Sequence, residues 1–124
     1  MTDSQALGLL LVLFAFAGAK RRTLSLVSLR ELAARHGFPD PDLAAAVAMA
    51  ESGGYASAVG DFGTSFGLWQ IHTPAHPQFR FTDLFDVDNN ARAALAISNK
   101  GTNWKPWSTF NDGKHLKYLR RPAS

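Results

Sequence analysis

A single glutamate at the end of an alanine-rich segment is the side chain in this sequence best suited to acid–base chemistry. Glu51 follows "PDLAAAVAMA" and shares one helical stripe with Leu43, Val47 and Ala50. A carboxyl group on such a stripe points towards the core or the floor of a cleft, where burial raises its pKa. A protonated carboxyl group is the proton donor that cleavage of a glycosidic bond requires. The spacing alone leaves open the alternative that Glu51 faces water in a last helical turn.

Glycines follow Glu51, and an aromatic residue paired with an amide comes soon afterwards. The glycines are Gly53, Gly54, Gly60 and Gly63, and they leave space for the close approach of a ligand. Trp69 and Gln70 supply an apolar plane and an amide, a pairing suited to an N-acetyl sugar. Further stacking surfaces are available from other aromatic side chains: Tyr55, Phe66, Trp104 and Trp107. For each aromatic residue, packing in the core is the alternative explanation.

These motifs, in this order, resemble one known family. "AMAESGG" followed by "GLWQI" is similar to segments of the lysozyme-like soluble lytic transglycosylases, which are related to goose-type lysozymes. The family's Glu-Ser pair matches Glu51-Ser52, and its Gly-Leu-(Met/Trp)-Gln motif matches residues 67–70. "NARAA" at 90–94 and "WKPWSTF" at 104–110 also resemble family segments, the latter mainly in phage and actinobacterial members. The resemblance covers roughly residues 40–119.

The resemblance implies cleavage of the β-1,4 bond between N-acetylmuramic acid and N-acetylglucosamine in peptidoglycan. Glu51 would act first as general acid and then as base on the muramoyl 6-hydroxyl, giving a 1,6-anhydro product without a protein nucleophile or a cofactor. Ser52 would orient the reacting groups, and Gln70 would hold the substrate or Glu51. The complete set of expected substrate contacts is Ser52, Tyr55, Gly67, Leu68, Trp69, Gln70, Trp104 and Trp107.

The sequence departs from the family where many members carry an Ala-Tyr-Asn motif, whose Tyr orients the glutamate. Residues 103–108 here read "NWKPWS", so the partner of Glu51 is not identified. Goose-type lysozymes activate water with hairpin carboxylates, and Asp61 is the one carboxylate in that region. Asp61 is therefore either a turn residue or the second carboxylate of a hydrolase. A third alternative is a non-catalytic peptidoglycan-binding or structural virion protein that keeps the fold.

The remaining pattern predicts a mainly α, lysozyme-like α+β domain over residues 23–124. Helices are expected at about 26–36, from Pro41 to about residue 52, from about Asp88 to Lys100, and at about 112–119. Asp40 is the expected N-cap of the second helix, and Asp86 or Asp88 that of the third. The glycine-rich stretch 53–72 favours a loop or a small β-hairpin.

The first 22 residues are expected to form a membrane anchor. Residues 4–19 are uncharged and mostly apolar, and Lys20, Arg21 and Arg22 follow them. A cleavable signal peptide is less favoured because no basic residue precedes the apolar run, and a buried core helix is the third alternative.

The expected topology conflicts with the expected substrate. The basic cluster after the apolar run places the following domain in the cytoplasm by the positive-inside rule, whereas peptidoglycan lies outside it. A phage virion with an internal membrane would reconcile the two, since the domain would be packaged in the virion with other virion proteins and act during entry. The other explanation is a bacterial inner-membrane protein whose domain faces the periplasm.

Other classes of function have little support in the sequence. The 124 residues include no cysteine, which excludes disulfides and thiolate metal sites, and the net charge of +3 is only mildly basic. His72 and His76 are four residues apart, but Pro74 lies between them and no glutamate accompanies them, so no metal site is expected. The basic residues indicate a solvated face, and no specific nucleic-acid partner is expected.

Overall fold

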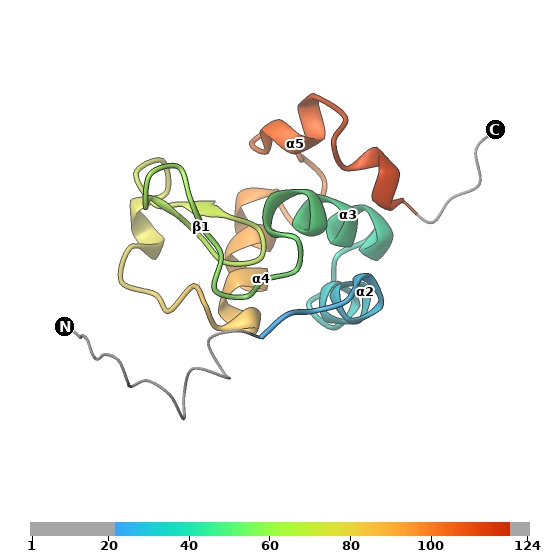
Figure 1. The fold of residues 1–124 in the computed structure, drawn as a ribbon, viewed down its shortest axis with the longest axis horizontal. Helices are drawn as coiled ribbons and strands as arrows, with labels where there is room; N and C mark the ends of the chain where they lie inside the picture. Colours follow the sequence, from blue (N-terminus) through green and yellow to red (C-terminus); the bar gives the residue numbers. More distant parts are fainter. Residues whose placement is uncertain (1–21, 120–124) are drawn as a thin grey trace.

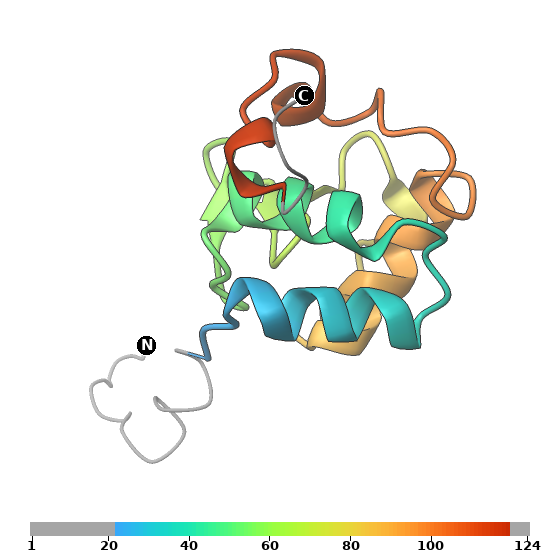
Figure 2. The same ribbon diagram turned by 90° about the vertical axis from the view of Figure 1, so that its right-hand side faces the viewer.

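Helix α3, Pro41–Ser52, lies at the centre of the fold in the computed structural model, which describes residues 22–119 (Figure 1). Helix α2, Leu26–Arg35, packs against one side of α3. The C-terminal segment, with helix α5 at Ser108–Asn111 and the 3-10 helix η2 at Leu116–Tyr118, packs against the opposite side (Figure 2). The result is a small, mainly helical domain with a short sheet, which agrees with a lysozyme-like α+β fold.

The ends of α3 follow from local sequence signals. The Asp40 carboxylate accepts a hydrogen bond from the Leu43 N–H at 3.1 Å, and Pro41 occupies the first helical turn. Gly53 ends the helix with a φ of 66°, which a residue with a Cβ adopts poorly. The predicted start and end of this helix are confirmed, and Glu51 therefore lies in its last turn.

Helix α4, Val87–Ile97, is confirmed with a slightly earlier start than predicted. Asp86 is the N-cap, and its carboxylate accepts from the Asn89 N–H at 2.9 Å. Asp88 instead lies inside the first turn, where it accepts from His36 Nε2 at 2.7 Å and so ties α4 to the end of α2. This contact lowers the pKa of Asp88.

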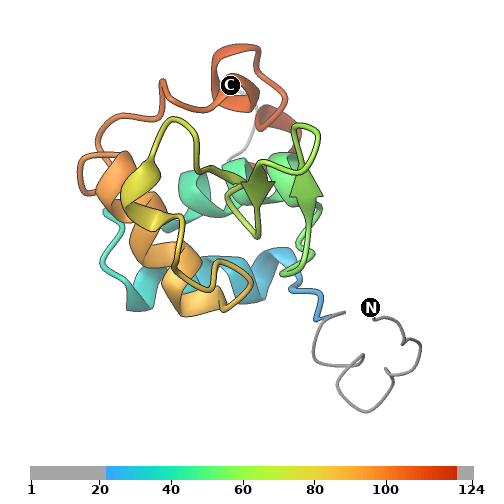
Figure 3. The ribbon, with the colours of Figure 1, turned by 90° about the vertical axis from the view of Figure 1, so that its left-hand side faces the viewer.

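The predicted hairpin is a three-stranded antiparallel sheet of very short strands. The strands β1, β2 and β3 pair in that order and span Val59–Gly60, Ser65–Phe66 and Ile71–His72. Val59 faces Phe66, and Phe66 in turn faces Ile71. A third strand forms because residues 67–70, "GLWQ", reverse the chain so that β3 pairs with β2. The sequence predicted only a loop or a two-stranded hairpin here. The sheet lies beside α3 with the C-terminal segment above both (Figure 3).

The single helix predicted at 112–119 is wrong. The chain forms α5 at Ser108–Asn111, a turn around Gly113, and the separate 3-10 helix η2. Gly113 has a φ of 83°, which interrupts a right-handed helix at that point. The shift is important for the site, because it places residue 109 on a helix directly against α3.

The core is built around Trp69, which is fully buried. Its ring stacks on Phe38 with a centroid separation of 5.7 Å, and its Nε1 donates to the Ala44 carbonyl at 3.0 Å. Trp107 Nε1 donates to the Trp69 carbonyl at 2.7 Å, and Trp104 packs on Phe38 and Trp107. These contacts join the C-terminal segment to α3 and to the sheet.

Asn90 on α4 holds the loop that precedes Trp69. Its side chain is fully buried, accepts from the Trp69 N–H at 2.8 Å, and donates to the carbonyls of Phe66 at 2.9 Å and Leu84 at 2.8 Å. Gly67 has a φ of 79°, and a Cβ there would lie 2.2 Å from Asn90 Nδ2. The glycine of the "GLWQ" motif is therefore required by this packing.

The predicted anchor over residues 4–19 lies outside the described residues, and so does most of the 1–22 segment. Within residues 22–119, no helix combines the length and apolar character needed to span a bilayer. The described chain enters beside the end of α3, where Leu24 N–H donates to the Gly54 carbonyl at 2.8 Å and Ala56 N–H to the Arg22 carbonyl at 2.9 Å.

Candidate active site

Glu51 lies half-buried in a cavity of about 190 Å³ between α3, the sheet and the C-terminal segment. The sheet side contributes Asp61, Gln70 and the two histidines of β3 and the following turn. The C-terminal side contributes the stretch from Pro106 to Ser108. The full lining consists of Glu51, Asp61, Gln70, Ile71, His72, His76, Ile97, Pro106, Trp107 and Ser108. The cavity thus gathers side chains from four separate parts of the sequence.

Thr109 on α5 is the hydrogen-bond partner of Glu51. Its Oγ1 donates to Glu51 Oε2 at 2.6 Å across a separation of 58 residues. Two residues earlier, Trp107 is fixed by its hydrogen bond to the Trp69 carbonyl, so the core sets the position of α5. This partner was not predictable from the sequence, because no local pattern links a threonine in "WSTF" to a glutamate on a distant helix.

The environment of Glu51 favours its protonated form. Burial raises the pKa of the Glu51 carboxyl above its ordinary value, and the Thr109 hydrogen bonds act in the opposite direction. The charges of Asp61 and Asp112 add to the increase. A carboxyl group with this balance keeps its proton to higher pH while retaining a partner for the carboxylate that forms when the proton leaves.

Asp61 is both a turn residue and a lining residue of the cavity. Its φ is 51°, and its backbone carbonyl accepts from Thr64 Oγ1 at 2.6 Å, as expected in a tight turn. Its carboxylate accepts from Ser65 Oγ at 2.5 Å, and Ser65 Oγ lies 3.1 Å from His72 Nδ1. The two roles that the sequence left open for Asp61 are therefore structurally compatible.

A protein-family model described as a lysozyme-like domain matches residues 30–109. The chain belongs to this family. The matched span contains α3, the sheet, α4 and the first residues of α5, and so includes both Glu51 and Thr109. No curated protein and no solved structure shows significant similarity to the chain. Membership in the lysozyme-like domain family indicates action on peptidoglycan and cleavage of glycosidic bonds.

Gln70 lies in the cavity of this lysozyme-like domain, but it is not hydrogen-bonded to Glu51. Its Nε2 donates to the carbonyls of Ala58 at 3.1 Å and Gly67 at 3.0 Å. A Cβ at Gly60 would lie 2.3 Å from Gln70 Oε1, so the side chain packs tightly against β1. The amide is thus fixed at the cavity wall, in a position to meet a ligand.

The expectation that the tryptophans offer open stacking surfaces is wrong. Trp69 and the preceding Leu68 are fully buried, and Trp104 and Trp107 are exposed by only 4% and 5%. Their rings belong to the hydrophobic core and pack on Phe38 and on one another. Only the Trp107 side chain of this group reaches the cavity wall.

Ser52 and Tyr55, two further residues that were expected to contact the substrate, do not line the cavity. Ser52 is buried outside the cavity lining, and its hydroxyl donates to the Ala48 carbonyl at 2.9 Å and accepts from the Gly54 N–H at 3.1 Å, so it closes the helix end. Tyr55 is exposed but lies outside the cavity lining.

His72 and His76 both line the cavity, opposite the C-terminal segment. From the sequence they were candidates only for a metal site. Burial lowers the pKa of His76, and the neighbouring His72 adds to the decrease. A neutral imidazole at this place offers one donor and one acceptor to a polar ligand.

Proposed function

We propose that the protein is a peptidoglycan lytic transglycosylase that cleaves the β-1,4 bond between N-acetylmuramic acid and N-acetylglucosamine. The observation that carries the proposal is the protonation-favouring environment of Glu51 inside a cavity of a lysozyme-like domain. Cleavage of this bond needs a proton on the leaving oxygen, and Glu51 is positioned to supply it.

In the proposed reaction, Glu51 first acts as acid and then as base. The carboxyl proton passes to the bridging oxygen as the bond to the muramoyl C1 breaks, which leaves a carboxylate that accepts from Thr109. The substrate's own N-acetyl group stabilises the cationic C1. The carboxylate then takes the proton of the muramoyl 6-hydroxyl, whose oxygen bonds to C1 and closes the 1,6-anhydro ring. Glu51 ends protonated, ready for a further cycle.

Thr109 is the positioning residue in this proposal, because its hydroxyl donates to Glu51 Oε2 at 2.6 Å. Replacing Thr109 with Val removes the hydroxyl and preserves the shape of the side chain. We expect kcat to fall about 10- to 100-fold, because a hydrogen bond to a charged group contributes about 1.5–3 kcal/mol. The pKa of Glu51 should rise further, so the alkaline limb of the pH–rate profile moves to higher pH.

The matched control is Thr109→Ser, which keeps the hydroxyl and should restore both the rate and the position of the alkaline limb. A Thr109→Val variant with a reduced rate but an unshifted pH profile would indicate a structural role only.

A hydrolytic lysozyme is the second candidate, and the presence of Asp61 in the same cavity is the observation that favours it. In that reaction Asp61 would activate a water molecule that attacks C1 in place of the 6-hydroxyl. Mass analysis of released muropeptides separates the two reactions, since a lyase gives 1,6-anhydro ends and a hydrolase gives reducing ends. We expect anhydro ends, in the same proportion for Asp61→Asn as for the wild type. Reducing ends that disappear in Asp61→Asn would establish the hydrolase.

We further propose that residues 4–19 anchor the protein in a membrane, and that the protein is a virion component of a phage with an internal membrane, acting during entry. The run of uncharged residues followed by Lys20, Arg21 and Arg22 supports this placement. Protease treatment of intact virions should leave the domain uncut until the virion is disrupted. Digestion from the outside of intact particles would contradict the packaged location.

A further inference from the structure

The turn between β1 and β2 has an unusual backbone. Asp61, Phe62 and Gly63 have φ values of 51°, 55° and 90°, so three consecutive residues are left-handed. The N–H groups of Gly63 and Thr64 both donate to the Gly60 carbonyl at 3.0 Å and close the turn. Glycine adopts this backbone readily, whereas a bulky residue with a Cβ is penalised. Phe62 is therefore poorly suited to its own backbone conformation.

Packing does not compensate for this strain. The relative exposure of Phe62 is 108%, the highest among the exposed large apolar residues of the described chain. The backbone conformation of Phe62 costs free energy on folding, and its exposed ring gains none from burial. A strained backbone conformation that burial does not offset is the kind of outlier from which a functional hypothesis can be drawn.

The position of Phe62 indicates what it binds. Phe62 directly follows Asp61, which lines the cavity that contains Glu51. A glycan strand that is cut internally extends beyond the cavity on both sides of the scissile bond. The tryptophans, by contrast, are almost entirely buried and cannot stack on the part of the strand outside the cavity.

We propose that Phe62 is a sugar-stacking platform that binds one ring of the glycan strand outside the cavity; this inference rests on the proposed action on peptidoglycan. The C–H face of a pyranose ring and the face of a phenyl ring are both apolar, and their contact removes both from water. The left-handed turn holds the ring away from the core and towards solvent, where a strand can reach it.

The test uses full-length protein in mild detergent with the Glu51→Gln substitution, so that the substrate is bound but not consumed. Retention on sedimented peptidoglycan sacculi is compared between this parent and the same chain carrying Phe62→Asn, because Asn tolerates a left-handed backbone. We expect the apparent affinity to fall about three- to tenfold, while the melting temperature rises by about 5 °C. A purely structural role would not give weaker binding together with higher stability.

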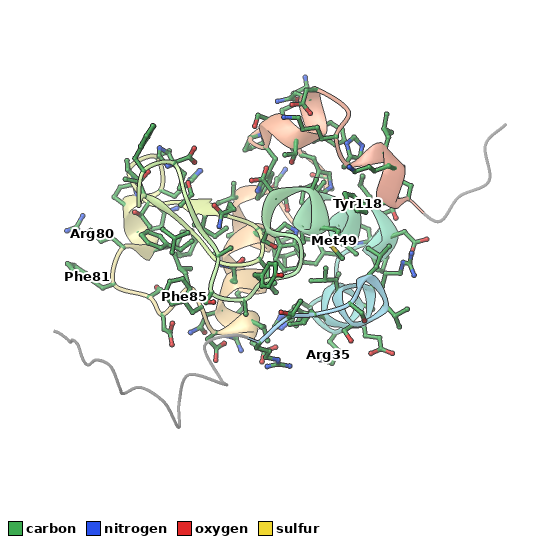
Figure 4. All side chains as sticks on the ribbon, viewed as in Figure 1. Arg35, Met49, Arg80, Phe81, Phe85 and Tyr118 are labelled. Carbon is green, nitrogen blue, oxygen red and sulfur yellow. The ribbon has the colours of Figure 1, made fainter. Side chains whose placement is uncertain are left out.

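Phe81→Asn in the same parent is the matched control. Phe81 is 90% exposed on the loop between η1 and α4, lies outside the cavity lining, and points away from the molecule (Figure 4). We expect this variant to bind sacculi like the parent.

Two outcomes would overturn the inference. The first is equal retention of the Phe62→Asn and parent proteins. The second is an equal loss in the Phe81→Asn control. If wild-type protein cleaves peptidoglycan in either of these cases, the proposed function stands and only the role of Phe62 fails.

Discussion

Replacing Glu51 with Gln is expected to lower the rate of peptidoglycan cleavage by about 100- to 10,000-fold, the usual contribution of a general acid. Gln has nearly the same shape and can still accept from Thr109, but its amide protons are not acidic enough to be transferred to the leaving oxygen. The rate is measured as the loss of turbidity of purified sacculi.

Glu31→Gln is the matched control for this experiment, because Glu31 is the one other glutamate in the sequence. It is exposed on α2 and lies outside the cavity, so its replacement should leave the rate unchanged. Undiminished turbidity loss with Glu51→Gln would exclude Glu51 as the acid and would show that another group supplies the proton.

The same Glu51→Gln variant also has an expected effect on stability, with a sign set by the raised pKa of Glu51. A group whose pKa is higher in the folded state than in the unfolded state destabilises the fold once the pH exceeds its folded-state pKa. The variant should therefore unfold at a higher temperature than the wild type at pH 8, and the difference should shrink towards pH 4. A variant less stable than the wild type at pH 8 would show that the carboxylate is held favourably in the fold.

The largest expected loss of stability follows from replacing Asn90 with Ala. The change leaves the buried N–H of Trp69 and the carbonyls of Phe66 and Leu84 without their hydrogen bonds to this side chain. Each buried polar group left unsatisfied costs about 1–3 kcal/mol, so we expect a total loss of about 3 kcal/mol or more. For a domain of this size, that corresponds to a decrease in melting temperature of about 10 °C.

Asn89→Ala is the neighbouring control for Asn90. The Asn89 side chain makes only exposed hydrogen bonds, to Asp83 and Arg92, and its removal should change stability by about 0.5 kcal/mol. Equal melting temperatures of the two variants would show that the three buried contacts of Asn90 contribute little.

The helices were predictable because their signals are local. The N-cap Asp40, the following Pro41 and the terminating Gly53 lie within a few residues of the helix ends that they determine. The same holds for the Asp86 cap of α4. Glu51 was therefore placed correctly in a last helical turn, and its expected burial was right in direction.

The cavity was less predictable because it depends on contacts between distant segments. The sequence does not distinguish a tryptophan that packs in the core from one that lines a cleft. Trp69 was therefore expected to contact the substrate, whereas its ring is buried in the core. Thr109 meets Glu51 only because Trp107 fixes α5 through the Trp69 carbonyl. The strain at Phe62 likewise arises from the turn geometry, which the stretch "VGDFGTSF" does not reveal.

The most direct test of the account is to identify which bond the protein breaks, by digesting purified sacculi and determining the masses of the released fragments. We expect muropeptides released by cuts between N-acetylmuramic acid and N-acetylglucosamine with the wild type and with Glu31→Gln, and none with Glu51→Gln. Intact glycan strands with cut peptides, or the same fragments from Glu51→Gln, would contradict it.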